Sequence, residues 1–339
     1  MSRRIVRCGL LVVVAMNCMA MMSTGGCPGG MSAPGDMSGD MNDGGTPGNT
    51  GQSAGIYVTN FGGQSMTVYS LDAMGDAAPI RTISGPNTEL NGPIGIARDS
   101  QRRIYVANRS GGQVTVYAPG ANGDAAPVSK LTDANMGSPE GIAIANTDEV
   151  FVTNAPTLGG LGGIAGLFHF PANATASDFN ISGPNTGITV PVGVALDELR
   201  NIFVANAFGG TIDHFAPGQS GNQFPVRSFS PGGNTQSIAY GNASVLLGAG
   251  SIGINTYPST ASGNTMATGN IGNVGFTGLI HFDTDVTPPV IYVTDFFGNK
   301  VHIIQTVGVA PFLSVGSIRT IEGPSTGLQS PLGVLVVKT

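Results

Sequence analysis

Apolar and polar residues recur along this chain in a five-residue unit. Three mainly β-branched or aromatic residues are followed by Thr or Ala and then by Asn or Asp. The unit is found at Ile56–Asn60, Ile104–Asn108, Val150–Asn154, Ile202–Asn206 and Ile291–Asp295, with a worn copy at Val245–Ala249. Successive copies begin 43 to 52 residues apart. A period of this length predicts a repeat architecture.

Each repeat has the pattern of four short strands separated by turns. In the second repeat the runs are Ile94–Ala97, Ile104–Ala107, Val114–Tyr117 and Val128–Leu131, with Gly, Pro, Asn and Asp between them. Runs of this length that are rich in β-branched and aromatic residues predict strands. No run with helical periodicity interrupts the repeats. Four antiparallel strands repeated six times predict an all-β protein, a six-bladed β-propeller.

The two ends of the repeat region indicate how the ring closes. Nothing strand-like precedes Ile56, whereas an extra first strand, Pro331–Val336, follows the last complete repeat. We expect this C-terminal strand to pair with the N-terminal blade, which would leave no open sheet edge. The predicted propeller therefore spans residues 55–339.

A longer motif gives a resemblance to a known family. Pro93–Asp99 and Pro191–Asp197 have the form Pro-x-Gly-Ile/Val-Ala-x-Asp, each followed by an Ile-Tyr/Phe-Val-Ala-Asn strand. This pattern resembles the NHL-repeat and related YVTN-type propellers, over about residues 55–339. The resemblance implies the fold, but a shared fold does not carry a function with it.

The N-terminus predicts export. Arg3, Arg4 and Arg7 precede an apolar run of 14 residues, Gly9–Met22, a length typical of a signal peptide and too short for a membrane span. Thr24–Cys27 resembles a bacterial lipobox, although Thr24 stands where an apolar residue is usual. We therefore expect residues 1–27 to be a signal peptide with Cys27 lipidated, and the protein to be anchored in the cell envelope. The alternative is cleavage near Ala20, which gives a soluble periplasmic or secreted protein.

Residues 28–54 are rich in Gly, Ser, Pro and Asn without periodicity, which predicts a disordered linker. All three cysteines, Cys8, Cys18 and Cys27, precede the repeats, so the propeller has no disulfide or thiolate metal site.

Only 10% of residues are charged and the net charge is −6, without a long basic run. Nucleic-acid binding is not expected. We expect a monomer whose only membrane contact is the lipid.

The Asn residues that end the repeated strands are the first candidates for a binding site. Equivalent strands end at the same face of a propeller, so these residues and the loop residues beside them should form one loop-rich surface. The predicted binding residues are Asn60, Phe61, Asn108, Arg109, Asn154, Asn206, Phe208, Asp295 and Phe296. The alternative is structural: an Asn before a turn caps the hairpin, and loop aromatics pack on neighbouring blades.

Catalytic motifs are absent from the sequence, and the four histidines have no metal-triad spacing. His281 lies on a predicted inner strand, within reach of the channel, and Asp99, Asp197 and Asp283 are expected to close turns. Propeller lactonases of the gluconolactonase type hold a divalent cation with Glu, Asn and Asp. No predicted first strand carries a Glu here; Glu140 comes just before the strand Gly141–Ile144. The sequence therefore predicts a binding module, with an unknown protein or small-molecule ligand at the loop-rich face, no catalysis, no metal and no cofactor. A lactonase-like hydrolase with Ca²⁺ near the axis is the alternative.

Overall fold

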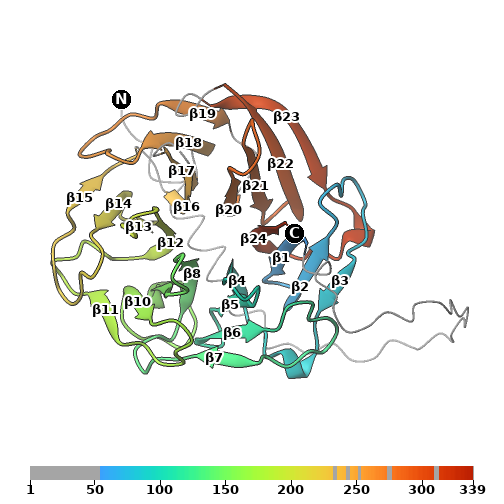
Figure 1. Ribbon diagram of the computed structural model, residues 1–339, viewed down its shortest axis with the longest axis horizontal. Coiled ribbons are helices and arrows are strands. Elements are labelled where there is room, and N and C mark those ends of the chain that lie inside the picture. The colour runs from blue at the N-terminus through green and yellow to red at the C-terminus, as the bar shows by residue number, and fades with distance from the viewer. Residues whose placement is uncertain are drawn as a thin grey trace, which may run out of the picture.

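Six four-stranded antiparallel sheets form a closed ring, as Figure 1 shows. This computed structural model describes residues 54–231, 235–241, 245–250, 253–272, 277–308 and 313–338. The all-β, six-bladed architecture predicted from the repeats is thus confirmed. The predicted signal peptide, Cys27 and nearly all of the predicted linker lie outside the described residues.

The strands have equivalent places in each blade. The inner strands, which surround the axis, are β4 (Pro93–Arg98), β8 (Pro139–Ile144), β12 (Pro191–Leu196), β16 (Thr235–Gly241), β20 (Thr277–Asp283) and β24 (Pro331–Val337). The second strands are β1 (Gly55–Asn60), β5 (Ile104–Asn108), β9 (Val150–Asn154), β13 (Ile202–Asn206), β17 (Val245–Gly250) and β21 (Val290–Asp295). The third strands are β2 (Ser65–Tyr69), β6 (Gln113–Tyr117), β10 (Gly166–Phe170), β14 (Thr211–Phe215), β18 (Gly253–Pro258) and β22 (Lys300–Val307). The outer strands are β3 (Arg81–Ile83), β7 (Ser129–Leu131), β11 (Phe179–Ser182), β15 (Arg227–Phe229), β19 (Gly269–Gly272) and β23 (Ser314–Ile321).

Helical structure in the described residues is limited to three single 3₁₀ turns: η1 (Pro86–Thr88), η2 (Pro156–Leu158) and η3 (Pro324–Thr326). Within the described ranges, none of these turns approaches the length and apolar character of a membrane-crossing helix.

The core of the protein lies between the blades. One apolar cluster joins Tyr57 and Val68 of the first blade to Ile104 and Tyr117 of the second, and similar clusters occur between the other neighbouring blades. Both faces of a second strand therefore face other sheets, which explains why every residue of β1 is buried. A strand that is buried on both faces shows a continuous apolar run rather than an alternating pattern.

Ring closure occurs as the sequence predicted. The inner strand β24 pairs antiparallel with β1, with Gly55 opposite Val337 and Tyr57 opposite Leu335. The first blade thus takes its inner strand from the opposite end of the propeller sequence. This pairing removes the open edge that β1 would otherwise present.

Two predicted boundaries were wrong by one or two residues. Thr235 pairs with Gly250 in the fifth blade as Pro191 pairs with Asn206 in the fourth, so Gly250, and not Ala249, occupies the Asn position. The mismatch arose because Val245, which has no counterpart in the five-residue unit, begins β17. The inner strand β8 begins at Pro139 rather than Gly141, which places Glu140 within the strand.

A recurring contact ties the first, second and fourth blades each to the blade before it in the ring. Gly123 of the second blade donates its N–H to the carbonyl of Thr82 in the first blade. The carbonyl of Gly123 accepts a hydrogen bond from the N–H of Ser84. The carboxylate of Asp124 accepts hydrogen bonds from the N–H and side-chain amide of Asn87, at 2.8 and 2.9 Å. We call this contact the inter-blade latch. It recurs between Asp76 and Ser325 and between Asn222 and Asn185, both at 2.7–2.8 Å.

Candidate functional site

The central channel has two chemically different ends. Strand pairing places Asn108 opposite Pro93 at one end of the second blade and Arg98 opposite Ile104 at the other. The same pairing in the other blades puts Asn60, Asn154, Asn206 and Asp295 at the first end, which we call the Asn face. The inner strands finish at the other end, which we call the opposite face.

At the Asn face the four predicted Asn side chains are fully buried. The amide of Asn108 accepts a hydrogen bond from the N–H of Asn91 at 3.0 Å and donates to Thr115 Oγ1 at 2.9 Å. Equivalent bonds join Asn60 to Gln329 and Thr67, and Asn206 to Thr189 and Asp213. Asn154 accepts from the N–H of Ser138 and donates to the carbonyl of Ile164. Each amide therefore connects the hairpin to the loop that leads into the inner strand.

Asp295, which ends the second strand of the sixth blade, is half-buried. Its carboxylate accepts a hydrogen bond from the N–H of Gly298 at 2.9 Å and lies 3.9 Å from His302 Nε2. It therefore closes its own turn by accepting a hydrogen bond from the backbone three residues on.

Aromatic residues and one ion pair close the channel at the Asn face. Phe296 packs with Ile94 and Leu332, and Phe61 lies against them. Phe208 packs on a neighbouring apolar cluster. The structure thus brings the nine predicted binding residues to one end of the channel. Their role in ligand binding remains a prediction from the sequence.

Arg109 and Glu140 form the ion pair. The guanidinium donates to both carboxylate oxygens at 2.6 and 2.7 Å and lies 5.4 Å from the centre of the Phe61 ring. Glu140 is completely buried and Arg109 is 3% exposed. Burial raises the pKa of Glu140, and the charge of Arg109 opposes that rise. The cavity beside the pair is about 10 Å³, which is room for about one water molecule.

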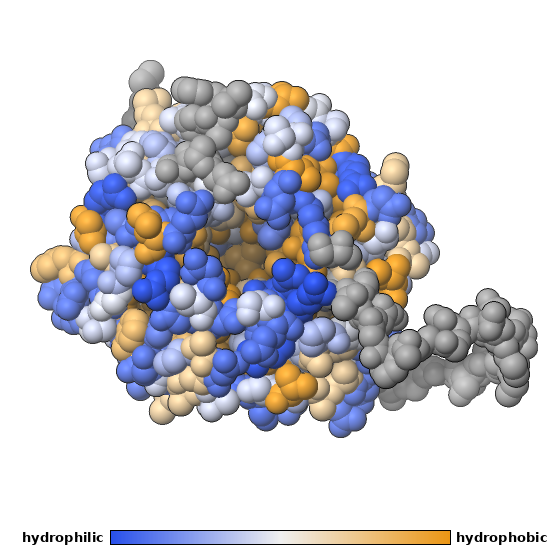
Figure 2. All heavy atoms as spheres, viewed as in Figure 1, coloured by the Kyte–Doolittle hydropathy of each residue, from blue (hydrophilic) through white to orange (hydrophobic). Residues whose placement is uncertain are grey.

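The middle of the channel is apolar and narrow. A cavity of about 50 Å³ is lined by residues of all six inner strands, including Ile96, Ile142, Val194, Ile238, Ile280 and Val334. Figure 2, viewed down the axis of the ring, shows a hollow at the centre with hydrophobic residues in its depth and hydrophilic residues on its rim.

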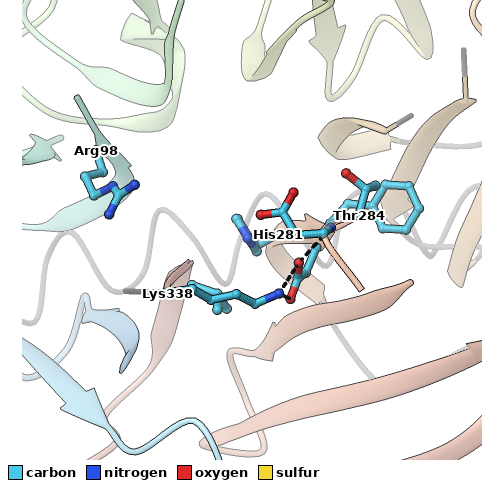
Figure 3. A pocket seen from close by; sticks show the side chains of 8 residues that line it. Arg98, His281, Thr284 and Lys338 are labelled. Carbon is cyan, nitrogen blue, oxygen red and sulfur yellow. Dashed lines mark hydrogen bonds and ion pairs between the residues drawn. The ribbon is translucent and has the colours of Figure 1, made fainter. Parts of the chain in front are cut away.

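The channel widens into a polar pocket of about 340 Å³ at the opposite face, which we call the axial pocket. Its walls are Arg98, His281, Phe282, Asp283, Thr284, Asp285, Val336 and Lys338. Figure 3 shows Arg98 on one side of the pocket and His281, Thr284 and Lys338 across from it. The volume falls in the range of about 300–1,000 Å³ that is usual for small-molecule sites.

One ion pair lies within the axial pocket. Lys338 Nζ is 2.7 and 2.6 Å from the two oxygens of Asp283, whose side chain is only 4% exposed. Asp283 also accepts the N–H of Asp285 at 3.1 Å, so it closes its turn as the sequence predicted. Asp99 and Asp197 close the corresponding turns of their blades.

His281 is neutral at physiological pH. Burial lowers its pKa to about 4, the charge of Asp283 opposes this shift, and that of Lys338 adds to it. The ring contacts the edge of Tyr292, with 6.1 Å between centroids. The prediction that an inner-strand histidine reaches the channel is supported, because His281 lines the axial pocket.

Sequence reasoning missed Arg98, Asp285 and Lys338. Arg98 pairs with Ile104 at the end of its inner strand, where the third and fourth blades have Ile144 and Leu196. A comparison of this position between blades would have identified Arg98 as a departure from the repeat. Lys338 has no such signal, because it follows the strand that closes the ring.

A second histidine site lies between the third and fourth blades. His169 stacks on Phe179, with 4.3 Å between centroids, and its Nδ1 is 2.6 Å from Asp178. Its Nε2 lies 3.5 Å from Glu149, which also binds Arg200. In the described part of the chain, no three His, Cys, Asp or Glu side chains converge as a metal site would require.

Comparison with known proteins supports the fold. No family model matches the chain, and no curated protein matches it. Among solved structures, a streptogramin B lyase aligns with a TM-score of 0.51 and 10% identity, over 83% of this chain and 85% of the lyase. A catalytically inactive virginiamycin B lyase from Staphylococcus aureus with quinupristin aligns with a TM-score of 0.50 and 13% identity, over 81% and 87%. The WD40 β-propeller domain of Doa1 aligns with a TM-score of 0.50 and 10% identity, over 70% and 71%. At these identities the similarity shows the β-propeller fold alone.

Proposed function

We propose that this protein is an exported, lipid-anchored β-propeller that binds a small polar molecule in the axial pocket. The observation that carries the proposal is the contrast between the two ends of the channel. At the Asn face Phe296 and the Arg109–Glu140 pair are buried, with the partly buried Phe61 packed against Phe296, whereas a charged pocket of about 340 Å³ opens at the opposite face. This proposal places binding at the opposite end of the channel from the loop-rich face, whose binding residues stay a prediction from the sequence.

The proposed activity is binding without catalysis. One histidine, His281, is among the described residues that line the axial pocket; its pKa is about 4, and a base this weak is poorly matched to proton transfer near neutral pH. The neighbouring propellers include lyases, but at 10–13% identity their chemistry does not transfer to this chain. The NHL- or YVTN-type assignment rests on the Pro93–Asp99 and Pro191–Asp197 motifs.

Filling the pocket tests its role. Thr284→Trp places a large side chain on the pocket wall, and Thr175→Trp places the same side chain on an exposed loop of the third blade. We expect thermal-shift screening with small charged and neutral solutes to find ligands that stabilise wild type and Thr175→Trp but not Thr284→Trp. Ligands that stabilise all three equally, or no ligand at all, would contradict the proposal.

The anchor is tested separately. Globomycin blocks processing of lipoprotein precursors, so we expect it to leave the unprocessed form of this protein. Cys27→Ser should move the protein from the membrane to the soluble fraction. Normal processing under the drug would favour cleavage near Ala20, and membrane association that survives Cys27→Ser would contradict anchoring through the lipid.

The Ca²⁺-dependent hydrolase remains the second prediction from the sequence, and no observation in the described residues favours it. Metal analysis of the dialysed protein is its test. One Ca²⁺ per chain that survives dialysis would contradict the metal-free proposal.

A further inference from the structure

The charges of the described residues that line the axial pocket sum to zero, but they are not all paired with one another. Two cations, Arg98 and Lys338, and two anions, Asp283 and Asp285, come from β4, β20, the loop after β20, and the residue after β24. Lys338 is held by both oxygens of Asp283. The charges of Lys338 and Asp283 therefore neutralise each other. Arg98 and Asp285 are the cation and the anion that remain.

The guanidinium of Arg98 makes no hydrogen bond or ion pair with any described residue, although the side chain is half-buried. Figure 3 shows it extending from β4, apart from the Lys338 contacts that are drawn as dashed lines. The carboxylate of Asp285 is exposed and is likewise unpaired within the described ranges. A half-buried guanidinium without an anionic partner is a favourable site for a carboxylate, which it binds through two parallel hydrogen bonds.

The neutral imidazole of His281 lies on the pocket wall with these charges. In its neutral form the ring offers one donor and one acceptor, so it can bond a polar ligand without changing the charge of the site. Because two cations and two anions line the pocket, a ligand with a net charge of either sign meets repulsion as well as attraction. A zwitterion can place each of its charges beside a group of opposite sign.

We infer that the axial pocket binds a small zwitterion with one carboxylate and one ammonium group, such as an amino acid or a short peptide. The carboxylate pairs with Arg98, the ammonium pairs with Asp285, and His281 bonds the polar part between them. This inference rests on the proposed function, because it names the chemical class of the ligand for the same pocket.

Calorimetric titration of the full chain tests the inference with matched probes. The zwitterions are glycine, γ-aminobutyrate, 6-aminohexanoate and Ala-Ala, which differ in the distance between their charges. Each is compared with its N-acetyl derivative, which lacks the cation, and with its amide, which lacks the anion. We expect at least one zwitterion to bind, and both of its singly charged derivatives to bind at least tenfold more weakly.

Two charge variants assign the partners. Arg98→Gln should weaken the zwitterion at least tenfold and leave the amide unaffected, whereas Asp285→Asn should weaken the zwitterion and leave the N-acetyl derivative unaffected. Lys130→Gln removes a surface charge that pairs with Glu89 at 2.9 Å, away from the pocket, and should bind as wild type does. Circular dichroism establishes that each variant is folded.

The outcomes separate this inference from the proposed function. If only neutral or singly charged solutes bind, and Thr284→Trp abolishes their binding, the zwitterion inference is wrong and the pocket remains a binding site. If a zwitterion binds equally to wild type and Arg98→Gln, the inference is also wrong. If none of the zwitterions, their derivatives or the neutral solutes binds, both proposals fail.

Discussion

At the scale of single residues, the polar side chains at the two ends of the channel differ in whether they have hydrogen-bond partners. The Asn amides and the Arg109–Glu140 pair are buried and hydrogen-bonded at one end of the channel. Arg98 and Asp285 lack partners among the described residues at the other end, and His281 is held neutral. Buried polar groups with all their hydrogen bonds made are typical of structural roles, whereas unpaired groups around a cavity indicate binding.

The buried ion pair gives a stability prediction. Glu140→Leu leaves the Arg109 guanidinium buried without its partner, so we expect it to lower the free energy of unfolding by about 3–5 kcal/mol. The double variant Arg109→Leu/Glu140→Leu removes both charges and should recover most of that loss. Urea unfolding of the three proteins is the measurement. A double variant as unstable as the single one would show that the pair itself, and not the orphaned charge, determines stability.

His281 gives a pH prediction. The pKa of this residue is about 6.5 in the unfolded chain and about 4 in the folded protein, so the unfolded state binds more protons between these values. The contribution of His281 to the free energy of unfolding is therefore fully present above pH 6.5 and is lost as the pH falls towards 4. Because the side chain is only partly covered, we expect a loss of about 2 kcal/mol.

The measurement compares wild type with His281→Gln by urea unfolding at pH 7.5 and 4.5. The variant retains Arg98, Asp283, Asp285, Lys338 and Tyr292, the groups that face the ring, so their own titration largely cancels. Wild type should lose about 2 kcal/mol more than the variant between the two pH values. An equal loss in both proteins would show that His281 is not held neutral.

At the scale of elements, the inter-blade latch explains a repeated Gly-Pro sequence that the strand pattern leaves unexplained. Gly85 has φ 128°, and a Cβ at this position would collide with the carboxylate of Asp124. Gly183 and Gly323 meet Asn222 and Asp76 in the same way, with φ 115° and 131°. These three glycines let a side chain from the next blade approach the backbone closely.

Gly85→Ala should therefore destabilise the protein by about 1–3 kcal/mol, from backbone strain and the collision with Asp124. Gly123→Ala is the matched control, since Gly123 also has positive φ, 64°, but a Cβ there meets nothing within 4 Å. We expect the control to cost only about 1 kcal/mol. Thermal unfolding measures both. Equal losses would mean that positive φ alone, and not the latch, requires the glycine at Gly85.

At the scale of the whole molecule, the fold was predictable and the site was not. Repetition supplies six copies of each strand, so an eroded copy such as β17 is outweighed by the other five. The axial pocket has no such redundancy. Arg98, Asp285 and Lys338 are far apart in the sequence and meet only because the ring is closed. At the position of Arg98 the third and fourth blades carry Ile144 and Leu196, so the pocket departs from the repeated pattern and is not marked by it.

Deletion of residues 331–339 tests the closure. The truncated chain loses β24 and exposes the edge of β1, so we expect it to self-associate rather than remain monomeric. A synthetic peptide of residues 330–339 should restore a monomer on size-exclusion chromatography by pairing with β1, whereas a scrambled peptide should not. A truncated chain that is monomeric, with the thermal midpoint of wild type, would contradict the role of β24.

The pairing of β24 with β1 also means that the first blade cannot be completed until the end of the chain has been synthesised. The two strands are separated by about 270 residues, so at roughly 5–20 residues per second β1 leaves the ribosome about 15–50 s before its partner. During that interval the nascent first blade has an unpaired apolar edge, and the axial pocket lacks Lys338. The growing chain therefore needs protection by a chaperone, or delayed folding of the first blade, until the last strand arrives.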